Sequence, residues 1–339
     1  MTMDTTTRYL GLELRHPLVA SAGPLTQTVD QVKALADTGL GAIVLHSMFA
    51  ERLRREAERD QELEDVGAES FAEASNYFPS IAESVEPGAA YLRLLERAAG
   101  AVDVPLIASL NAAGVGSWTA YARRLADAGA SAIECNVYFV PGDVTLSGAD
   151  VEARQLEIVA AVTDSVSLPV AVKLSPFLSS PGNFALRVVD AGASGLVLFN
   201  RFLQPSVNVE RVTVEPGVAL SNPAEAQVPR TWIATLRNHT SASLAATSGV
   251  SDASDVAAYL LAGADVVMTT SALVRNGAGY ARTLIDGLTA WMRVKGFASV
   301  DAFRGLLAVP SGADENAFAR SGYVAALEKA QLTYGSLRD

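Results

Sequence analysis

A lysine lies within an otherwise apolar run of the sequence. Lys173 is one of four lysines in the chain and belongs to VAVKL (residues 170–174), which has the composition of a buried strand. A buried ammonium group is costly without a partner, so a lysine there usually meets an anionic ligand or a carboxylate. The alternative is a strand-end lysine that extends into solvent. We expect Lys173 to be catalytic and to bind a cofactor.

Two asparagines end the apolar runs before and after this one. Asn136 closes AIECN (residues 132–136) and Asn200 closes GLVLFN (residues 195–200). Either alone could be a turn former, but with Lys173 on the run between them their amides can hydrogen-bond a planar heterocycle. Because side chains alternate along a strand, Glu134 and Asn136 should share one face and Cys135 the other.

Small residues follow two further apolar runs and predict a phosphate site. Thr247-Ser248-Gly249 and Thr269-Thr270-Ser271 would let backbone N–H groups approach an anion, and their hydroxyls add donors. The alternative is ordinary turns between strands and helices. We expect the same ligand to contact residues that end other runs, namely Ser21, Ala22, Gly23, Ser47 and Asn111.

The histidines show no metal-binding pattern. His46 ends an apolar run and is a further catalytic candidate, whereas His16 and His239 precede such runs and should be structural. The sequence contains no HxH, HExxH or clustered carboxylate motif, so we expect no metal.

All these residues lie at the ends of eight short apolar runs that alternate with helical stretches. This pattern predicts an α/β protein with a (β/α)8 (TIM) barrel, whose chemistry lies at the carboxyl ends of the strands. The runs are residues 16–23, 38–47, 104–111, 128–136, 168–175, 191–200, 242–249 and 262–270.

The segments outside the runs predict additions to the barrel. Residues 9–14 alternate apolar and polar side chains, so we expect a hairpin that plugs the bottom of the barrel. Insertions after the second and sixth strands, residues 49–86 and 201–229, should form a wall or lid over the ligand. We place one barrel domain at 1–308, with a last helix over 273–294, and a helical extension packed on it at 309–339.

Composition limits the partners and the compartment. The formal net charge of -11 and the absence of any Lys/Arg run argue against binding to nucleic acid or an anionic membrane. We find no membrane-spanning apolar segment and no signal peptide, and Cys135, the only cysteine, allows no intrachain disulfide. We expect a soluble, cytoplasmic protein that acts on a small molecule.

From Tyr9 to Leu307 the chain resembles the dihydroorotate dehydrogenases, which are FMN-containing (β/α)8 barrels of pyrimidine metabolism. The similar segments are ASAG (20–23), IECN (133–136), VPG (140–142), VKLSPF (172–177), GADVVMTTSAL (263–273) and GFASVDAFRG (296–305). The resemblance implies that FMN lies across the barrel mouth and that Lys173, Asn136 and Asn200 touch the isoalloxazine or the substrate. It implies that the last two strand loops hold the phosphate, and that the protein is a homodimer.

Three departures place the chain in a divergent, dihydroorotate dehydrogenase-like branch. The family's strand-4 loop carries a Cys or Ser base, whereas this loop reads NVYFVPG (136–142) and leaves Tyr138 as the nearest proton-transfer candidate. The family's lysine at the end of strand 2 is His46, and its asparagine-rich carboxylate-binding loop is replaced by SNYFPS (75–80). FMN is therefore implied by the resemblance, and dihydroorotate as substrate is not.

Together these observations predict an FMN-dependent oxidoreductase that acts on a CH–CH group of a small, possibly pyrimidine-like substrate, with an electron acceptor that the sequence does not identify. Two alternatives remain open. One is a Schiff-base aldolase or lyase that uses Lys173 on a phosphorylated substrate. The other is a flavin-binding protein that has lost catalysis.

Overall fold

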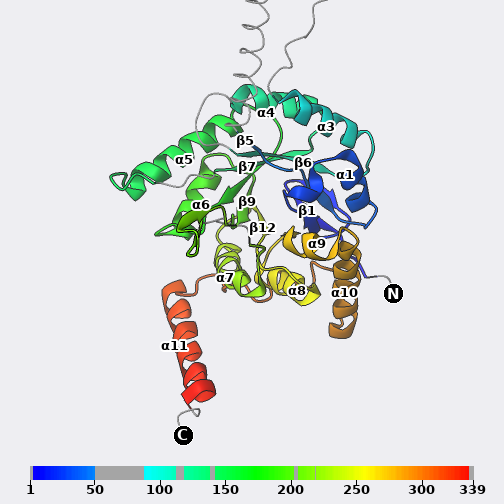
Figure 1. The fold of residues 1–339 in the computed structure, drawn as a ribbon. Coiled ribbons are helices and arrows are strands. Elements are labelled where there is room, and N and C mark those ends of the chain that lie inside the picture. Colours follow the sequence, from blue (N-terminus) through cyan, green and yellow to red (C-terminus); the bar gives the residue numbers. More distant parts are fainter. Residues whose placement is uncertain are drawn as a thin grey trace, which may run out of the picture.

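Eight parallel strands close into a barrel with helices around it (Figure 1). The computed structural model describes residues 3–49, 88–111, 118–137, 142–201, 205–217 and 219–335. Pairing of β3 with β13 and of β4 with β6 completes the circle, so the predicted (β/α)8 barrel is confirmed. The barrel strands are β3 (Leu18–Ala20), β4 (Ala42–Val44), β6 (Leu106–Asn111), β7 (Ala132–Asn136), β8 (Val170–Leu174), β9 (Gly195–Leu198), β12 (Ser243–Ala246) and β13 (Val266–Thr269).

The strands are buried on both faces, as expected for a parallel sheet covered by helices. Alternate side chains separate into two cores. Val44, Ile107, Ala132 and Ala171 belong to the cluster inside the barrel, whereas the side chains between them on the same strands pack against the helices, including Cys135. The predicted orientation of Cys135 towards the helix layer is therefore confirmed.

The helices between the strands begin and end at recognisable signals. Reciprocal capping boxes start α1 at Thr28, α5 at Ser147 and α8 at Asp252, and Gly263 ends α8 in a left-handed conformation. The surrounding helices are α1 (Val29–Ala36), α3 (Ala89–Ala99), α4 (Trp118–Asp127), α5 (Gly148–Thr163), α6 (Pro181–Asp190), α7 (Gln227–Leu236), α8 (Ala253–Ala262), α9 (Ser271–Asn276) and α10 (Tyr280–Lys295).

The last helix expected over 273–294 is two helices, α9 and α10. Gly277 separates them with φ 85° and ψ 162°, a backbone conformation that is nearly confined to glycine. A pattern of apolar residues continues through this break, which is why the sequence indicated a single helix.

The amino-terminal hairpin closes the bottom of the barrel, as predicted. Strands β1 (Thr7–Tyr9) and β2 (Leu12–Leu14) pair antiparallel. Tyr9, Leu10 and Leu14 are buried in the cluster inside the barrel. The hairpin therefore supplies the side chains that fill the amino-terminal end of the barrel.

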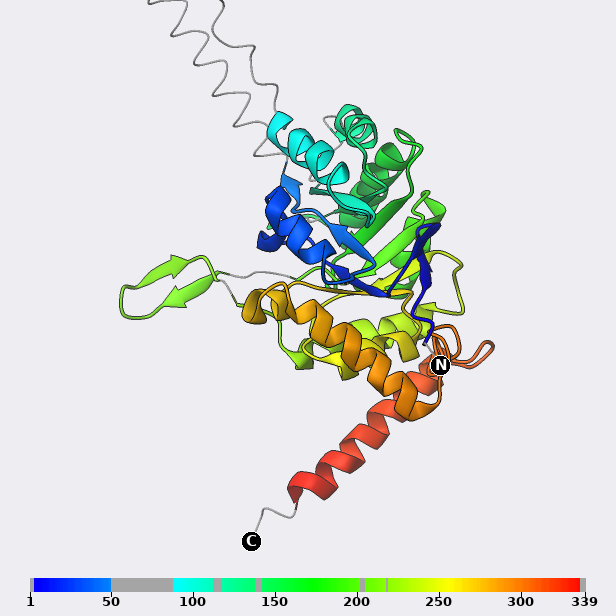
Figure 2. The same cartoon turned by 90° about the vertical axis from the view of Figure 1, so that its right-hand side faces the viewer.

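Two segments project from the barrel. Most of the insertion after β4 and β5 (Met48–Phe49) lies outside the described residues. The insertion after β9 forms an antiparallel hairpin, β10 (Ser206–Asn208) with β11 (Thr213–Glu215), which extends away from the barrel in Figure 2. Helix α11 (Glu315–Tyr334) also extends outwards rather than along the barrel, and its described side chains are almost all exposed. A division of the chain at residue 308 stays a prediction.

Candidate active site

A cavity of about 260 Å³ lies at the carboxyl ends of the strands, where the barrel architecture places chemistry. It brings together most of the predicted cofactor-binding residues from both halves of the chain. The predicted residues in its lining are Ser21, Ala22, Gly23, Lys173, Asn200, Ser248, Thr270 and Ser271.

Lys173 lies on the inner side of β8 at the floor of this cavity and is only 8% exposed. Its Nζ is 3.4 Å from Oε1 of Glu134 on β7 and 3.5 Å from Oγ of Ser21 beyond β3. Both contacts are long for charge-assisted hydrogen bonds, which are usually about 2.7–2.9 Å. The ammonium group is therefore paired but loosely held, and can also bind a ligand in the cavity.

The two predicted amides meet beside the lysine. Asn200 donates from Nδ2 to Oδ1 of Asn136 over 3.0 Å. Asn136 lies in register with Lys173 across the β7–β8 pair. Asn200 lines the cavity and Asn136 supports it from the next strand but one, so the contact orients one amide for a ligand.

The loop after β12 contains a tight turn with two consecutive residues of positive φ. Ser248 and Gly249 both adopt left-handed conformations, with φ of 78° and 69°. A Cβ atom on Gly249 would lie 2.5 Å from the backbone nitrogen of Ala226, so only glycine fits. Consecutive N–H groups in such turns form a concave site for anions. Ser248 also lines the cavity, which supports the predicted phosphate position.

Tyr259 on α8 holds this turn from behind. Its hydroxyl donates to the carbonyl oxygen of Ser248 at 2.7 Å and also lies 3.2 Å from that of Thr247. Burial raises the pKa of Tyr259 above its ordinary value, so the phenol stays protonated and remains a donor. The carbonyl groups of the turn are thereby held away from the cavity.

Hydroxyl groups connect the loops around the opposite wall. Thr270 Oγ1 donates to the carbonyl oxygen of Ser21 over 3.0 Å, which joins the loops after β13 and β3. Ser271 Oγ accepts hydrogen bonds from the backbone N–H and the hydroxyl of Ser221 at 3.1 Å and 2.9 Å. The segment after β11 is thus fastened over the cavity.

Other predicted residues lie outside this lining. His46 lines a separate cavity with Tyr91, where its Nδ1 is 3.2 Å from the carbonyl oxygen of Thr26. Ser47 and Ser109 share a hydroxyl–hydroxyl hydrogen bond of 2.8 Å. Gly249 shapes the turn but does not line the cavity, and Asn111 is buried at the end of β6. Tyr138 lies outside the described residues. The roles of these residues stay predictions.

Sequence reasoning missed part of the lining. Arg201 directly follows Asn200 and lines the cavity, where its guanidinium group bonds both oxygens of Glu225 at 2.9 Å and 3.4 Å. Burial raises the pKa of Glu225, but hydrogen bonds from Arg201 and Asn222 and the nearby arginine charges outweigh it and lower the pKa. The position of Arg201 at a strand end was the available signal. Ser221 and Leu220 come from the insertion, whose path the sequence did not specify.

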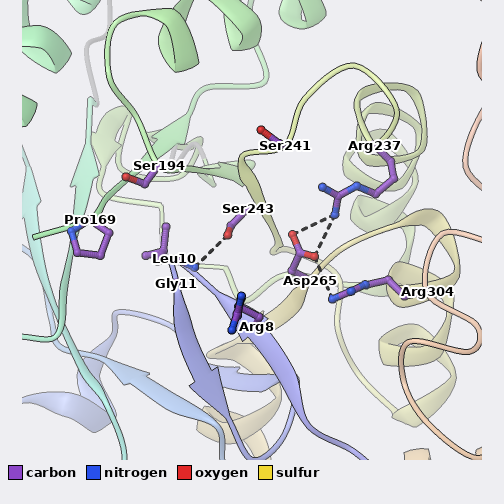
Figure 3. Close-up of a pocket in the computed structure, with 10 residues that line it drawn as sticks. All are labelled: Arg8, Leu10, Gly11, Pro169, Ser194, Arg237, Ser241, Ser243, Asp265 and Arg304. Carbon is purple, nitrogen blue, oxygen red and sulfur yellow. Dashed lines mark hydrogen bonds and ion pairs between the residues drawn. The ribbon is translucent and has the colours of Figure 1, made fainter.

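The larger cavity, about 470 Å³, lies at the opposite end of the barrel (Figure 3). Asp265 lies in its wall between Arg237 and Arg304, whose guanidinium nitrogens are 3.0 Å and 3.1 Å from its Oδ1. Its Oδ2 also accepts a hydrogen bond from the backbone N–H of Leu244 at 2.7 Å. Leu10 of the hairpin donates its N–H to Ser243 Oγ. These polar groups are engaged with one another and join the hairpin, the strands and the chain after α10. We interpret this end as structural, as is usual for such barrels.

A family model of dihydroorotate dehydrogenase matches residues 5–292. The chain belongs to the dihydroorotate dehydrogenase family. The sequence-based recognition of this family is thereby confirmed. The match covers every strand of the barrel.

Curated dehydrogenases are similar to the chain at modest identity. The catalytic subunit of dihydroorotate dehydrogenase B (NAD(+)) from Methanothermobacter thermautotrophicus is 27% identical over 308 residues, covering 88% of this chain and 97% of the relative. The corresponding subunit from Thermoplasma acidophilum is 24% identical, covering 89% and 98%. The NAD-dependent dihydropyrimidine dehydrogenase subunit PreA of Escherichia coli is 25% identical, covering 90% and 77%. These relatives are dehydrogenases, which supports an oxidoreductase.

Two further observations concern the described part of the chain. None of its helices is both long and apolar enough to cross a membrane. Within the same residues, no group of three or more His, Cys, Asp or Glu side chains is arranged to hold a metal ion.

Proposed function

We propose that the protein is an FMN-dependent oxidoreductase that acts on a CH–CH group of a small, pyrimidine-like substrate. The observation that carries this proposal is the convergence of Lys173, Asn200 and Ser248, the first residue of a left-handed turn, on one cavity at the carboxyl ends of the strands. The names of the family members add support, because both dihydroorotate and dihydropyrimidine dehydrogenases act on reduced pyrimidines.

The donor set fits FMN. Lys173 and Asn200 offer N–H donors to the polar edge of a planar ring, whereas Ala22, Val250 and Met268 provide apolar surface in the same cavity. At the other end, the turn at Ser248 and the hydroxyl group of Ser271 offer donors to a phosphate, whereas the Thr270 hydroxyl donates to the Ser21 carbonyl and holds the adjoining loop. When bound, FMN would supply a hydride acceptor at its N5 atom.

The protein's own part is to bind, orient and exclude water. The ammonium group of Lys173 stabilises negative charge that develops on a ligand in the cavity, where water is displaced. The Asn136–Asn200 hydrogen bond fixes an amide at the cavity wall. A proton must also be moved at the substrate carbon, and Tyr138 and His46 are our candidates for that role.

Dihydroorotate should be a poor substrate. A positioned base typically contributes about 10²–10⁴-fold to rate, and the loop after β7 contains a tyrosine where the family has Cys or Ser. A phenol with a reference pKa of about 10 is a weak base at neutral pH. Anaerobic mixing with dihydroorotate should leave the bound flavin oxidised for many minutes. Rapid bleaching that is abolished in Tyr138→Phe would instead identify Tyr138 as the base.

The cofactor is tested on the purified protein. We expect a yellow protein that releases FMN, and not FAD, on denaturation, because the cavity offers one compact phosphate site. Lys173→Met should weaken FMN binding at least tenfold while the barrel stays folded, since loss of a hydrogen bond to a charged group costs about 1.5–3 kcal/mol. Asn200→Ala should act in the same direction but less strongly. A colourless protein that cannot be reconstituted with FMN would refute the cofactor.

The same spectra separate the alternatives. An aldolase or lyase would show no flavin absorbance and would form a borohydride-trappable adduct at Lys173. A flavin-binding protein without catalysis would be yellow, but no dihydropyrimidine would reduce it under anaerobic conditions. The family assignment favours the oxidoreductase over the lyase.

We also propose a homodimer in the cytoplasm, with a separate electron acceptor. The β10–β11 hairpin supports the dimer, because its valines are strongly exposed on an isolated two-stranded ribbon, which is marginally stable alone. The exposed valines are Val207, Val209, Val212 and Val214, at 69%, 80%, 86% and 71%. Light scattering of the wild-type protein and of a variant with all four changed to Ser tests the dimer.

A further inference from the structure

A buried carboxyl group lies beside Lys173, and the proposed chemistry has not used it. Glu134 is on the inner side of β7 and its side chain is 1% exposed. Its Oε1 is 3.4 Å from the lysine Nζ. Its Oε2 is buried and has no hydrogen-bond partner among the described residues. A buried carboxylate is costly unless it is paired, so Lys173 is the group that compensates for it.

Among the described residues, the other groups around this pair do not provide a second charge. Tyr9 of the amino-terminal hairpin is buried in the interior cluster, and its hydroxyl has no partner among the described residues. Burial, followed by the charges of Glu134 and Asp265, raises its pKa well above the ordinary value, so this phenol is neutral. Ser21 is uncharged, and Arg201, which lines the same cavity, is engaged by Glu225. The lysine and Glu134 therefore depend on each other.

We propose that Glu134 is a positioning residue that keeps Lys173 protonated and directed into the cavity. Burial alone favours the neutral amine, whereas an opposite charge within about 4–6 Å favours the ammonium form. Because both contacts of Nζ are long, the ammonium group stays available to a ligand. The role of this ammonium group towards an FMN ring rests on the proposed function. A lysine that is already protonated stabilises new negative charge on the ring without first taking up a proton.

The protonation of Lys173 can be measured without any flavin. The chain has four lysines, at 33, 173, 295 and 329, so the lysine side-chain NMR signals of apoprotein labelled with ¹³C-lysine are few, and Lys173→Arg assigns the relevant one. The pH at which this signal changes is compared between the wild-type protein and Glu134→Gln. In Glu134→Gln the signal should change at a pH at least about one unit lower than in the wild-type protein, a tenfold loss of proton affinity or more.

Two variants separate charge from packing. Glu134→Asp keeps the negative charge and should restore most of the wild-type titration. Glu152→Gln removes the carboxylate that pairs with Arg187 at 2.7 Å on the outside of the barrel, and should leave the Lys173 signal unchanged. An unchanged Lys173 titration in Glu134→Gln overturns the proposal. If that variant does not fold, Glu134→Ala takes its place, and an unchanged Lys173 signal in Glu134→Ala overturns the proposal.

A second readout connects the pair to the cofactor. FMN affinity of the apoprotein, followed by quenching of FMN fluorescence between about pH 7 and pH 9.5, should be nearly constant for the wild type. In Glu134→Gln it should weaken about tenfold or more as Lys173 loses its proton, and adding Lys173→Met to Glu134→Gln should remove that pH dependence. A pH-independent loss of affinity in Glu134→Gln would assign the residue a packing role and overturn the proposal. If the wild type binds no FMN, the proposed function fails while the NMR result still stands.

Discussion

Replacement of Gly249 by alanine tests whether the turn after β12 forms the phosphate end of the site. Gly249 has φ of 69°, and its α-carbon faces Ala226, the residue before α7, so closely that a Cβ atom would lie 2.5 Å from the nitrogen and 2.8 Å from the Cβ of Ala226. Backbone atoms cannot move aside as the end of a flexible side chain can. Either the turn or the 223–226 segment must shift.

The expected cost has two parts. A left-handed conformation costs a residue with a Cβ atom roughly 1–2 kcal/mol. Overpacking against fixed neighbours adds about 1–3 kcal/mol. Gly296 isolates the first part, because it has φ of 78° at the end of α10 and its Cβ would meet nothing within 4 Å. We therefore expect Gly249→Ala to lower the free energy of unfolding by about 2–5 kcal/mol, and Gly296→Ala by about 1–2 kcal/mol.

Urea unfolding and FMN titration measure the two consequences separately. If the shifted turn loses one hydrogen bond to the phosphate, about 1.5–3 kcal/mol, FMN affinity should fall roughly ten- to a hundredfold in Gly249→Ala. Affinity should be unchanged in Gly296→Ala. Equal destabilisation of the two variants would refute the collision, and wild-type FMN affinity in a folded Gly249→Ala would refute the phosphate assignment.

Three further predictions concern stability and the turn. Asp265→Ala leaves Arg237 and Arg304 without their carboxylate partner and should lower the free energy of unfolding by about 3 kcal/mol, while FMN affinity stays unchanged. A loss below about 1 kcal/mol would contradict a structural role for the amino-terminal end of the barrel. Burial lowers the pKa of His16 from 6.5 to about 4, so the unfolded state binds the proton first, and stability should fall by up to about 3 kcal/mol as pH falls from about 6.5 to about 4; His16→Gln, compared with the wild type by urea unfolding at both pH values, should lack this component. Tyr259→Phe removes the hydroxyl behind Ser248 and should cost about 1 kcal/mol and weaken FMN binding, and an unchanged FMN affinity would show that the turn needs no such support.

The barrel and most of the cavity lining could be predicted because both follow from periodicity. Strands that are buried on two faces read as short apolar runs, and the polar residue that ends each run must lie at one edge of the closed sheet. Lys173, Asn200 and Ser248 were found in this way, although they are far apart in the sequence.

Contacts between side chains of different strands could not be predicted from the sequence pattern in the same way. Alternation places Glu134 inside the barrel, but only the β7–β8 register brings its oxygen to 3.4 Å from Lys173. The same limit applies to His46, which was predicted to end a strand but lies two residues after β4 and turns its ring towards Thr26 and Tyr91. The β10–β11 hairpin was missed because its exposed valines break the rule that apolar strands are buried.

The burial of Cys135 has a practical consequence for experiments on this protein. The only thiol of the chain is fully enclosed between barrel and helices, and burial, followed by the charge of Glu134, raises its pKa to about 12. The thiolate is the form that attacks thiol reagents, so the native protein should not react with them. A cysteine introduced at Val212, whose side chain is 86% exposed at the hairpin turn, would be a unique attachment point for a spin label or fluorophore. With one label on each chain, a homodimer would contain two labels, and the distance between them could be measured directly.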